Sequence, residues 1–238
     1  GSAYTLMTFL CSILLGLSLG SSTVFSQQYG RGDLQALRHS TYVSFVLIFA
    51  VTIVLNLIAF LALDPILRFL QVPAEVYPLM RDYLWIIFWG IIFTFIYNFY
   101  APLLRAVGDS VTPLWFLSLS VVLNILLDLF FILSLNWGIQ GAAIATVIAQ
   151  GVAAIGLALY TYRKRPELRI RRSEIYLDRA TLKEITAFST LTCVQQSTMN
   201  LGILLVQGLV NSFGTVVMAA FAAAVKIDSF AYMPVQEF

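Results

Sequence analysis

The sequence has 238 residues, of which 60% are apolar and 11% are charged, and its formal net charge is only +2. A soluble domain carries roughly 25% charged residues and about 45–50% apolar ones, so this composition excludes a soluble domain, a disordered chain, a collagen and a disulfide scaffold. The charges are also unevenly spread, and stretches without any charged residue cover 1–30, 40–63, 83–104, 110–127, 129–162 and 185–225.

These uncharged stretches have the length of membrane-spanning helices. A helix that crosses a bilayer needs about 20 mostly apolar residues, whereas a strand of a transmembrane β-barrel alternates polar and apolar residues over about ten. The stretches here are longer than such strands and apolar on all sides, and the mean hydropathy of the chain is +0.87. The sequence therefore predicts an all-α polytopic membrane protein with seven spans, the last of them incomplete.

The first five spans follow one another at short intervals. They are predicted over residues 3–26, 41–63, 83–104, 114–135 and 142–162. Between the second and third spans, the segment 66–70 is amphipathic, so we expect it to lie at the membrane interface. Short polar turns that contain glycine separate the other spans.

A basic linker follows the fifth span. Residues 163–183 hold eight of the fourteen Lys and Arg residues of the chain, with apolar side chains near helical spacing. We expect a linker with an amphipathic helix over 163–186. It would divide an amino-terminal lobe of five transmembrane helices, residues 1–162, from the first two helices of a carboxy-terminal lobe, residues 187–238, with spans over 187–213 and from Val216 onward.

The charges of the loops predict the orientation, because short loops rich in Lys and Arg stay in the cytoplasm. The loops after the first, third and fifth spans carry two, one and eight of these residues, whereas the opposite side carries only Arg68 and Arg81. We therefore expect these three loops to face the cytoplasm of a cell, with the protein in the plasma membrane, as in a bacterial inner membrane.

Two patterns in the spans are expected to serve packing. Cys11 and Cys193 both fall in apolar spans, which favours small core side chains over a disulfide or a metal pair. The segment Gly16-Leu-Ser-Leu-Gly20 matches the G-x-S-x-G pattern of hydrolases, but that nucleophile needs a strand, a turn and a helix. We expect Gly16 and Gly20 to permit close helix packing instead.

Several motifs, in order along the chain, resemble those of one transporter family. They are Gly16–Gly20 with Gln27–Asp33, Leu104–Asp109 with Thr112-Pro113, Asn124–Asp128, Gly138–Thr146, and Val210–Gly214 with Val225–Asp228 and Met233-Pro234. Together they resemble the multidrug and toxic compound extrusion (MATE) family, from its second helix to most of its eighth. The resemblance implies a MATE-like six-helix lobe with its first helix missing, plus the start of a second lobe, in a family whose two lobes flank a central cleft.

The resemblance also implies a function. It implies a secondary antiporter, not an enzyme, that exports organic and often cationic compounds in exchange for H⁺ or Na⁺, with no cofactor besides the coupling ion. The implied partners are a small organic substrate, the lipid bilayer and the missing helices of the same protein, and not nucleic acid. An alternative is a flippase for lipids or lipid-linked oligosaccharides, although more basic residues than Lys226 would be expected inside its lobes. An intramembrane enzyme is a third hypothesis, but Asp128 and Asp228, its only candidate acid pair, lie in no protease motif.

Asp128 and Asn124 form the strongest candidate site in the sequence. They are four residues apart, so both lie on one face of a helix, and Asp128 stands within about fifty otherwise uncharged residues. An ionised carboxylate near the membrane core costs at least a few kcal/mol, unless it is protonated, binds a cation or faces a cavity. Thr146, at the start of the next span, can add a hydroxyl oxygen, and oxygen ligands suit a hard cation such as Na⁺. The alternative is a protonated Asp128 that serves packing.

The family places an acid, an amide and a hydroxyl at the positions of this candidate site, and it adds an acid from the first helix, which we expect this chain to lack. A second candidate set is expected to line a substrate cleft, namely Gln195, Gln196, Asn200 and Lys226. The alternatives are hydrogen bonds between helices for the amides and a structural ion pair for Lys226.

Overall fold

The described chain is almost entirely helical. The computed structural model describes residues 2–69 and 77–212. Its elements are α1 (Ser2–Gly30), α2 (Leu34–Leu61), α3 (Leu63–Phe69), α4 (Tyr77–Ala106), α5 (Val111–Leu129), η1 (Phe130–Ser134), α6 (Gly138–Lys164), η2 (Pro166–Leu168), η3 (Arg172–Glu174) and α7 (Arg179–Ser212). η1 is a π-helical turn, whereas η2 and η3 are 3-10 turns. The predicted all-α class is confirmed.

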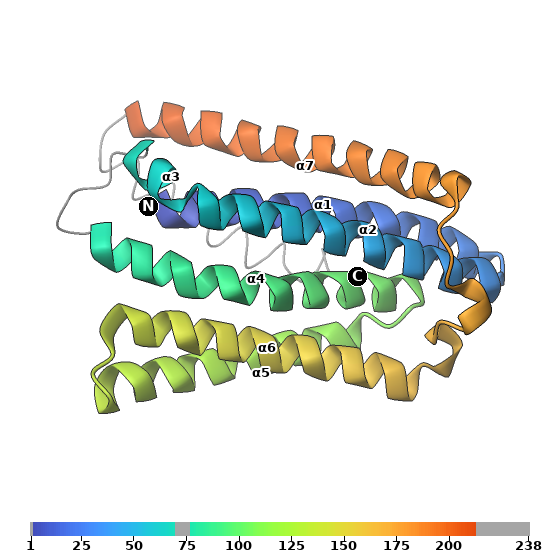
Figure 1. Ribbon diagram of the computed structural model, residues 1–238, viewed down its shortest axis with the longest axis horizontal. Coiled ribbons are helices and arrows are strands. Elements are labelled where there is room, and N and C mark those ends of the chain that lie inside the picture. The colour runs from blue at the N-terminus through green and yellow to red at the C-terminus, as the bar shows by residue number, and fades with distance from the viewer. Residues whose placement is uncertain (1, 70–76, 213–238) are drawn as a thin grey trace.

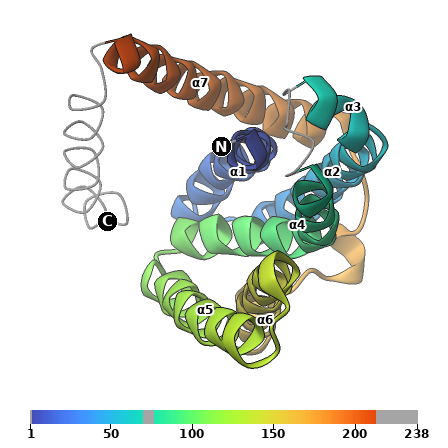
Figure 2. The same ribbon diagram turned by 90° about the vertical axis from the view of Figure 1, so that its left-hand side faces the viewer.

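The six long helices lie side by side and alternate in direction along the chain (Figure 1). α4 packs on α6, α1 and α2. α7 packs mainly on α1, and α5 packs mainly on α6. Viewed from the end, α4 therefore lies between the pair α1 and α2 and the pair α5 and α6 (Figure 2). Because successive helices alternate, the three basic loops lie at one end of the bundle, on the right in Figure 1, which we call the linker end.

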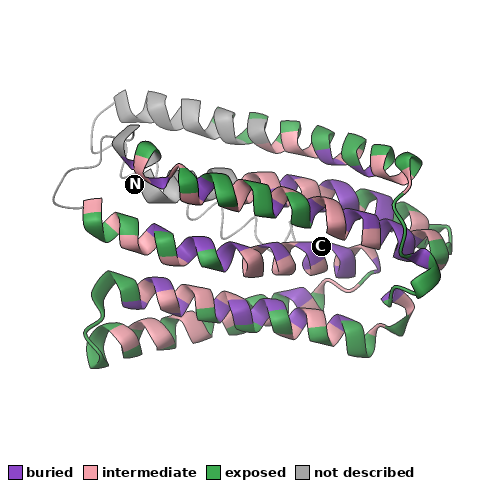
Figure 3. Ribbon diagram, in the orientation of Figure 1, coloured by how far each residue is buried: buried purple, intermediate pink, exposed green. Residues whose placement is uncertain are grey.

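The buried residues follow the faces along which neighbouring helices meet (Figure 3), chiefly those between α4 and α6 and between α1 and α7. Elsewhere the helices expose apolar side chains, and α5 exposes most of its length, with Trp115 at 72%. A soluble protein seldom exposes such a large apolar surface. On a membrane helix, this surface meets lipid or further helices.

Four helices of the described ranges are long and apolar enough to cross a membrane, namely α2, α4, the combined helix Val111–Ser134 and α6. They coincide with the second to fifth predicted spans, so the predicted helices at these four positions are confirmed. α1 and α7 occupy the positions of the first and sixth predicted spans, with 29 and 34 residues. The seventh predicted span lies outside the described residues.

Two aspartates fix where helices begin at the linker end. Asp33 Oδ1 accepts a hydrogen bond from the backbone N–H three residues later, at 2.9 Å, and Asp109 accepts from both the backbone N–H and the hydroxyl of Thr112, at 3.0 Å. These caps satisfy donors that the first turn of a helix leaves unpaired. Gly32 and Gly108 precede them with φ of 74° and 86°, a backbone conformation that glycine adopts without steric cost.

The amphipathic helix predicted within 163–186 is wrong. α6 stops before Pro166, because a proline ring disfavours helical backbone at the residue that precedes it. Two 3-10 turns follow, and the next α-helix is α7 itself. Ile175 and Leu177, two of the apolar residues near helical spacing in this segment, are exposed. The physical reason is that the acidic side chains of the linker turn inward to partners on the bundle, as described below, which a continuous surface helix would not permit.

α1 and α7 come into close contact at two glycines. A Cβ atom at Gly20 would lie 2.4 Å from the Cα of Ser189, and one at Gly16 would lie 2.6 Å from the Sγ of Cys193. The Ser189 hydroxyl donates to a backbone carbonyl of α1 at 3.1 Å. The predicted role of both glycines in close packing is confirmed, and Cys193 and Cys11 are free cysteines.

Replacing Gly20 with leucine should weaken the contact between α1 and α7. The Cβ alone would overlap backbone atoms of α7, which cannot move aside as a flexible side chain could. We expect the midpoint of thermal denaturation of the complete protein in detergent to fall by about 5 °C. Gly30→Leu is the matched control on the same helix, because nothing lies within 4 Å of a Cβ there. Equal shifts in both variants would contradict a special role for this contact.

Candidate functional site

The structure brings Asn124 and Thr146 together across the contact between α5 and α6. Asn124 Nδ2 donates a hydrogen bond to the Oγ1 of Thr146 at 3.4 Å. The Thr146 hydroxyl in turn donates to the carbonyl oxygen of Ala142 at 2.9 Å, one turn earlier in α6. The hydroxyl proton is therefore directed away from Asn124, and the hydroxyl oxygen faces the amide.

Asp128 lies one helical turn beyond Asn124 on α5. Its side chain is half-buried, and its Oδ1 is fully buried with no hydrogen-bond partner among the described residues. Tyr83, which α4 contributes, is close enough to interact electrostatically with this carboxylate. A buried carboxylate oxygen without a partner is costly, so a proton, a cation or a water molecule is needed to satisfy it. Tyr83 was missed at the sequence level.

An irregular turn follows Asp128 directly. Regular α-helix ends at Leu129, and the π-helical turn η1 continues the same helix, with the backbone N–H of Leu135 bonded to the carbonyl of Phe130 at 3.3 Å. Wide turns of this kind frequently accompany functional sites. The helix then reverses into α6, where Phe131 stacks on Trp137 with ring centroids 5.2 Å apart. This hairpin fixes α5 against α6 and thereby sets the register of Asn124 and Thr146.

An acid, an amide and a hydroxyl suit a proton or a hard monovalent cation. Within residues 2–69 and 77–212, there is no group of three or more His, Cys, Asp or Glu that could hold a metal ion. A transition-metal site would need several such ligands. Na⁺ can instead use one carboxylate together with neutral oxygens, and a proton needs only the carboxylate. Binding of Na⁺ by Asp128 and Asn124 remains a prediction.

The residues predicted to line a substrate cleft lie apart from this site. Gln195 is exposed and Gln196 is half-buried on α7, and in the described part of the chain α7 makes no contact with α5. Asn200 lies on α7, but its side chain is not described, and Lys226 lies outside the described residues. The structure therefore does not bring Gln195 or Gln196 to Asp128, and the role of all four residues in a cleft remains a prediction.

A second polar cluster, at the linker end, was missed at the sequence level. Arg38 of α2 donates its Nε–H to Glu174 Oε1 of η3 at 2.7 Å, and both side chains are buried, with exposures of 8% and 3%. Arg38 also donates to the carbonyl of Glu167 at 3.3 Å. The sequence feature that could have indicated this cluster is the presence of three acidic residues within the otherwise basic segment 163–183.

His39 extends this cluster. Its Nδ1 lies 3.1 Å from the carbonyl oxygen of Glu174, its Nε2 lies 2.6 Å from Asp178 Oδ1, and its ring stacks on Tyr176 with centroids 4.0 Å apart. Both nitrogens thus face acceptors, and both contacts are satisfied only when the ring carries two protons. The backbone N–H of Thr181, together with the His39 ring, lowers the pKa of Asp178 to about 2. We call Arg38, His39, Glu174, Tyr176 and Asp178 the linker clasp.

A further ion pair at this end holds the loop between α4 and α5 to the end of α6. Arg165 donates to Asp109 Oδ2 at 2.8 Å. Although burial acts in the opposite direction, the bonds from Arg165 and Thr112 lower the pKa of Asp109. The linker is therefore fastened to the bundle at α2, through the clasp, and at the loop before α5.

This chain is similar to known proteins over nearly its whole length. Residues 1–130 match the family model described as MatE. The chain is 33% identical over 231 residues to "Probable multidrug resistance protein YpnP" of Bacillus subtilis (strain 168), which covers 97% of this chain and 51% of that protein. It is 25% identical over 226 residues to "Probable multidrug resistance protein NorM" of Thermotoga maritima, covering 93% of this chain and 48% of that one.

The fold is similar to that of solved structures as well. A MOP superfamily transporter from Pyrococcus furiosus Vc1 (DSM3638) superposes with a TM-score of 0.88 and 22% identity, over 100% of this chain and 53% of that one. The arrangement of the helices is therefore that of about half of such a structure. The chain likewise spans about half the length of the curated relatives it matches.

Proposed function

The chain belongs to the MatE family, and on that premise we propose that it forms the amino-terminal lobe and the start of the second lobe of a secondary antiporter. The antiporter would export organic compounds, often cationic, in exchange for H⁺ or Na⁺. Two relatives described as probable multidrug resistance proteins support a cargo of this kind. A multi-pass position in a membrane follows from the four long apolar helices.

The observation that carries this proposal is the buried, unpartnered oxygen of Asp128 beside the pair of Asn124 and Thr146. A carboxylate in this position changes its charge and its hydrogen bonds when it takes up a proton or a cation. The acid, the amide and the hydroxyl oxygen would together hold the coupling ion. The alternative of a purely structural Asp128 is less favoured, because a structural carboxyl group would be expected to have a hydrogen-bond partner.

Binding of the ion would drive transport by changing the populations of two conformations of the transporter. A ligand shifts an equilibrium between two conformations by the difference in its affinity for them. If Asp128 holds its ion more tightly when the lobes face one side, then release of the ion favours the other state. Two lobes that move as rigid bodies around a central site are the common arrangement in such transporters.

Ethidium efflux tests the proposed function. Drug-sensitive cells that express the complete protein carrying this sequence should export ethidium faster than cells without it, and an imposed gradient of either H⁺ or Na⁺ should drive the export. Collapsing that gradient with an ionophore should stop export while ATP remains. Export that continues without either gradient would contradict antiport. An absence of export, with folded protein in the membrane, would contradict the proposed cargo.

A further inference from the structure

A cavity at the linker end is not used by the proposed transport mechanism. It has a volume of about 370 Å³ and lies between α2, α4, α6 and the linker. This volume falls in the range of about 300–1,000 Å³ that is typical of small-molecule sites. The wall is mainly apolar and aromatic, formed chiefly by Tyr42, Phe45, Phe99, Tyr100, Leu103 and Leu168.

Among the described residues, Arg169 is the one cation that lines this apolar cavity. Arg169 donates its Nε–H to the carbonyl of Tyr162 at 2.7 Å, and its guanidinium carbon lies 4.7 Å from the centre of the Tyr162 ring. These two contacts hold the side chain in place. Neither terminal nitrogen of Arg169 takes part in an ion pair or hydrogen bond with the described residues. A guanidinium fixed in this way presents two parallel N–H donors, which is the geometry that binds a phosphate.

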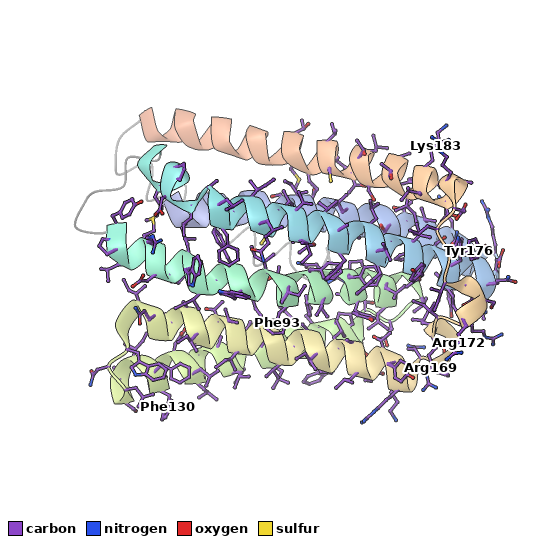
Figure 4. All side chains as sticks on the ribbon, viewed as in Figure 1. Phe93, Phe130, Arg169, Arg172, Tyr176 and Lys183 are labelled. Carbon is purple, nitrogen blue, oxygen red and sulfur yellow. The ribbon has the colours of Figure 1, made fainter. Side chains whose placement is uncertain are left out.

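In the linker, the acidic side chains face the bundle and most of the basic side chains face outward. All three acids of residues 163–183 make internal contacts, Glu174 and Asp178 in the clasp and Glu167 3.6 Å from Arg165. The other seven bases are exposed and make no ion pair with any residue that the structure describes, namely Arg163, Lys164, Arg169, Arg171, Arg172, Arg179 and Lys183. The outward face of residues 163–183 therefore carries bases and no acid, and the next exposed acid is Glu184. Figure 4 shows Arg169 and Arg172 together at this end.

From the cavity and this charge distribution, we propose that the cavity binds an anionic phospholipid of the cytoplasmic leaflet. Arg169 holds the phosphate of the headgroup, and one acyl chain enters the apolar space between α2, α4 and α6. The cavity lies where three long helices end, at the level of the lipid headgroups, and basic pockets between such helix ends recognise anionic lipids. The proposal depends on the orientation inferred from loop charge, and it is independent of the proposed coupling site.

Native mass spectrometry of the complete protein tests this proposal. The protein in detergent is incubated with equal amounts of dioleoylphosphatidylglycerol and dioleoylphosphatidylcholine, and the retained lipids are counted. We expect one phosphatidylglycerol to be retained in preference to phosphatidylcholine. Arg169→Gln should weaken that binding about tenfold, as the loss of a charged hydrogen bond does. Ile170→Trp should weaken it as well, since Ile170 is an exposed residue that lines the cavity and a larger side chain there would obstruct it.

Arg172→Gln is the matched control, because Arg172 is an exposed linker arginine outside the cavity. It should change the binding less than twofold. An effect as large as that of Arg169→Gln would show diffuse attraction to the basic linker and overturn the proposed site. Equal retention of both lipids, or displacement of the lipid by excess inorganic phosphate, would overturn the assignment to an anionic phospholipid. Unchanged binding in Ile170→Trp would exclude the cavity.

Discussion

The Asp128→Asn variant of the complete protein should lose coupled export and remain folded. Asparagine keeps the size of the side chain and its capacity for hydrogen bonds, but it can neither release a proton nor carry a negative charge to a cation. Folding should be kept because the substitution removes a costly buried carboxylate whose Oδ1 has no partner in the described structure. In proteoliposomes with an imposed H⁺ or Na⁺ gradient, we expect uphill ethidium transport to fall to the level of vesicles without protein.

The control for this variant is Asp33→Asn, which makes the same chemical change at the other end of the membrane helices. Asp33 caps α2 through its side-chain oxygen, and asparagine is as good a cap as aspartate. Export by Asp33→Asn should therefore match that of the wild type. Coupled export that survives in Asp128→Asn would exclude Asp128 as the coupling residue.

Neighbouring substitutions separate a cation site from a site that binds only a proton. Asn124→Leu and Thr146→Val remove the amide and the hydroxyl that meet at 3.4 Å, but they leave the carboxylate in place. If Na⁺ is the coupling ion, each should raise the Na⁺ concentration needed for half-maximal export by about tenfold, because each removes one oxygen ligand. If H⁺ is the coupling ion, export should keep its dependence on the proton gradient in both variants.

The sequence is most informative about elements that a local pattern defines. Stretches without charge predicted α2, α4, α5 and α6, although the helices extend beyond them. α2 was expected from Thr41 and begins at Leu34, since the capping aspartate starts the helix in the polar loop, outside the uncharged stretch. The spacing of four residues placed Asn124 and Asp128 on one face, and Thr146 came within reach because α5 and α6 form a hairpin.

Contacts between residues far apart in the chain could not be predicted in this way. Tyr83 approaches Asp128 only because α4 packs close to the hairpin of α5 and α6. Arg38 and Glu174 are 136 residues apart, and no periodicity shows which acid of a basic linker turns inward. The prediction of an amphipathic helix was wrong for the same reason. The spacing of apolar residues in the linker suggested a helix, but the contacts of its acidic side chains with the bundle determine its conformation.

Replacing Glu174 with alanine should release the linker from the bundle. Arg38 would then remain buried, with 8% of its side chain exposed, and it would lack its counter-charge. Breaking a buried ion pair from one side costs about 3–5 kcal/mol. For the complete protein in detergent, we expect the midpoint of thermal denaturation to fall by roughly 10 °C. Trypsin, which cleaves after Lys and Arg, should cut within 163–183 at least about tenfold faster, because local opening of the linker becomes easier.

Two further variants show whether the charge pair itself is responsible. Glu184→Ala removes an exposed carboxylate near the start of α7 and should leave both the midpoint and the rate of cleavage unchanged. The double variant Arg38→Met with Glu174→Met removes both charges and keeps similar volume, and such replacements of buried pairs are often neutral or stabilising. We therefore expect it to recover most of the lost thermal stability. If the double variant is as unstable as Glu174→Ala, then the uncompensated charge of Arg38 is not the cause of the lost stability. The loss would then come from the contacts of His39 with Asp178 and with the Glu174 backbone, which would depend on the Glu174 side chain.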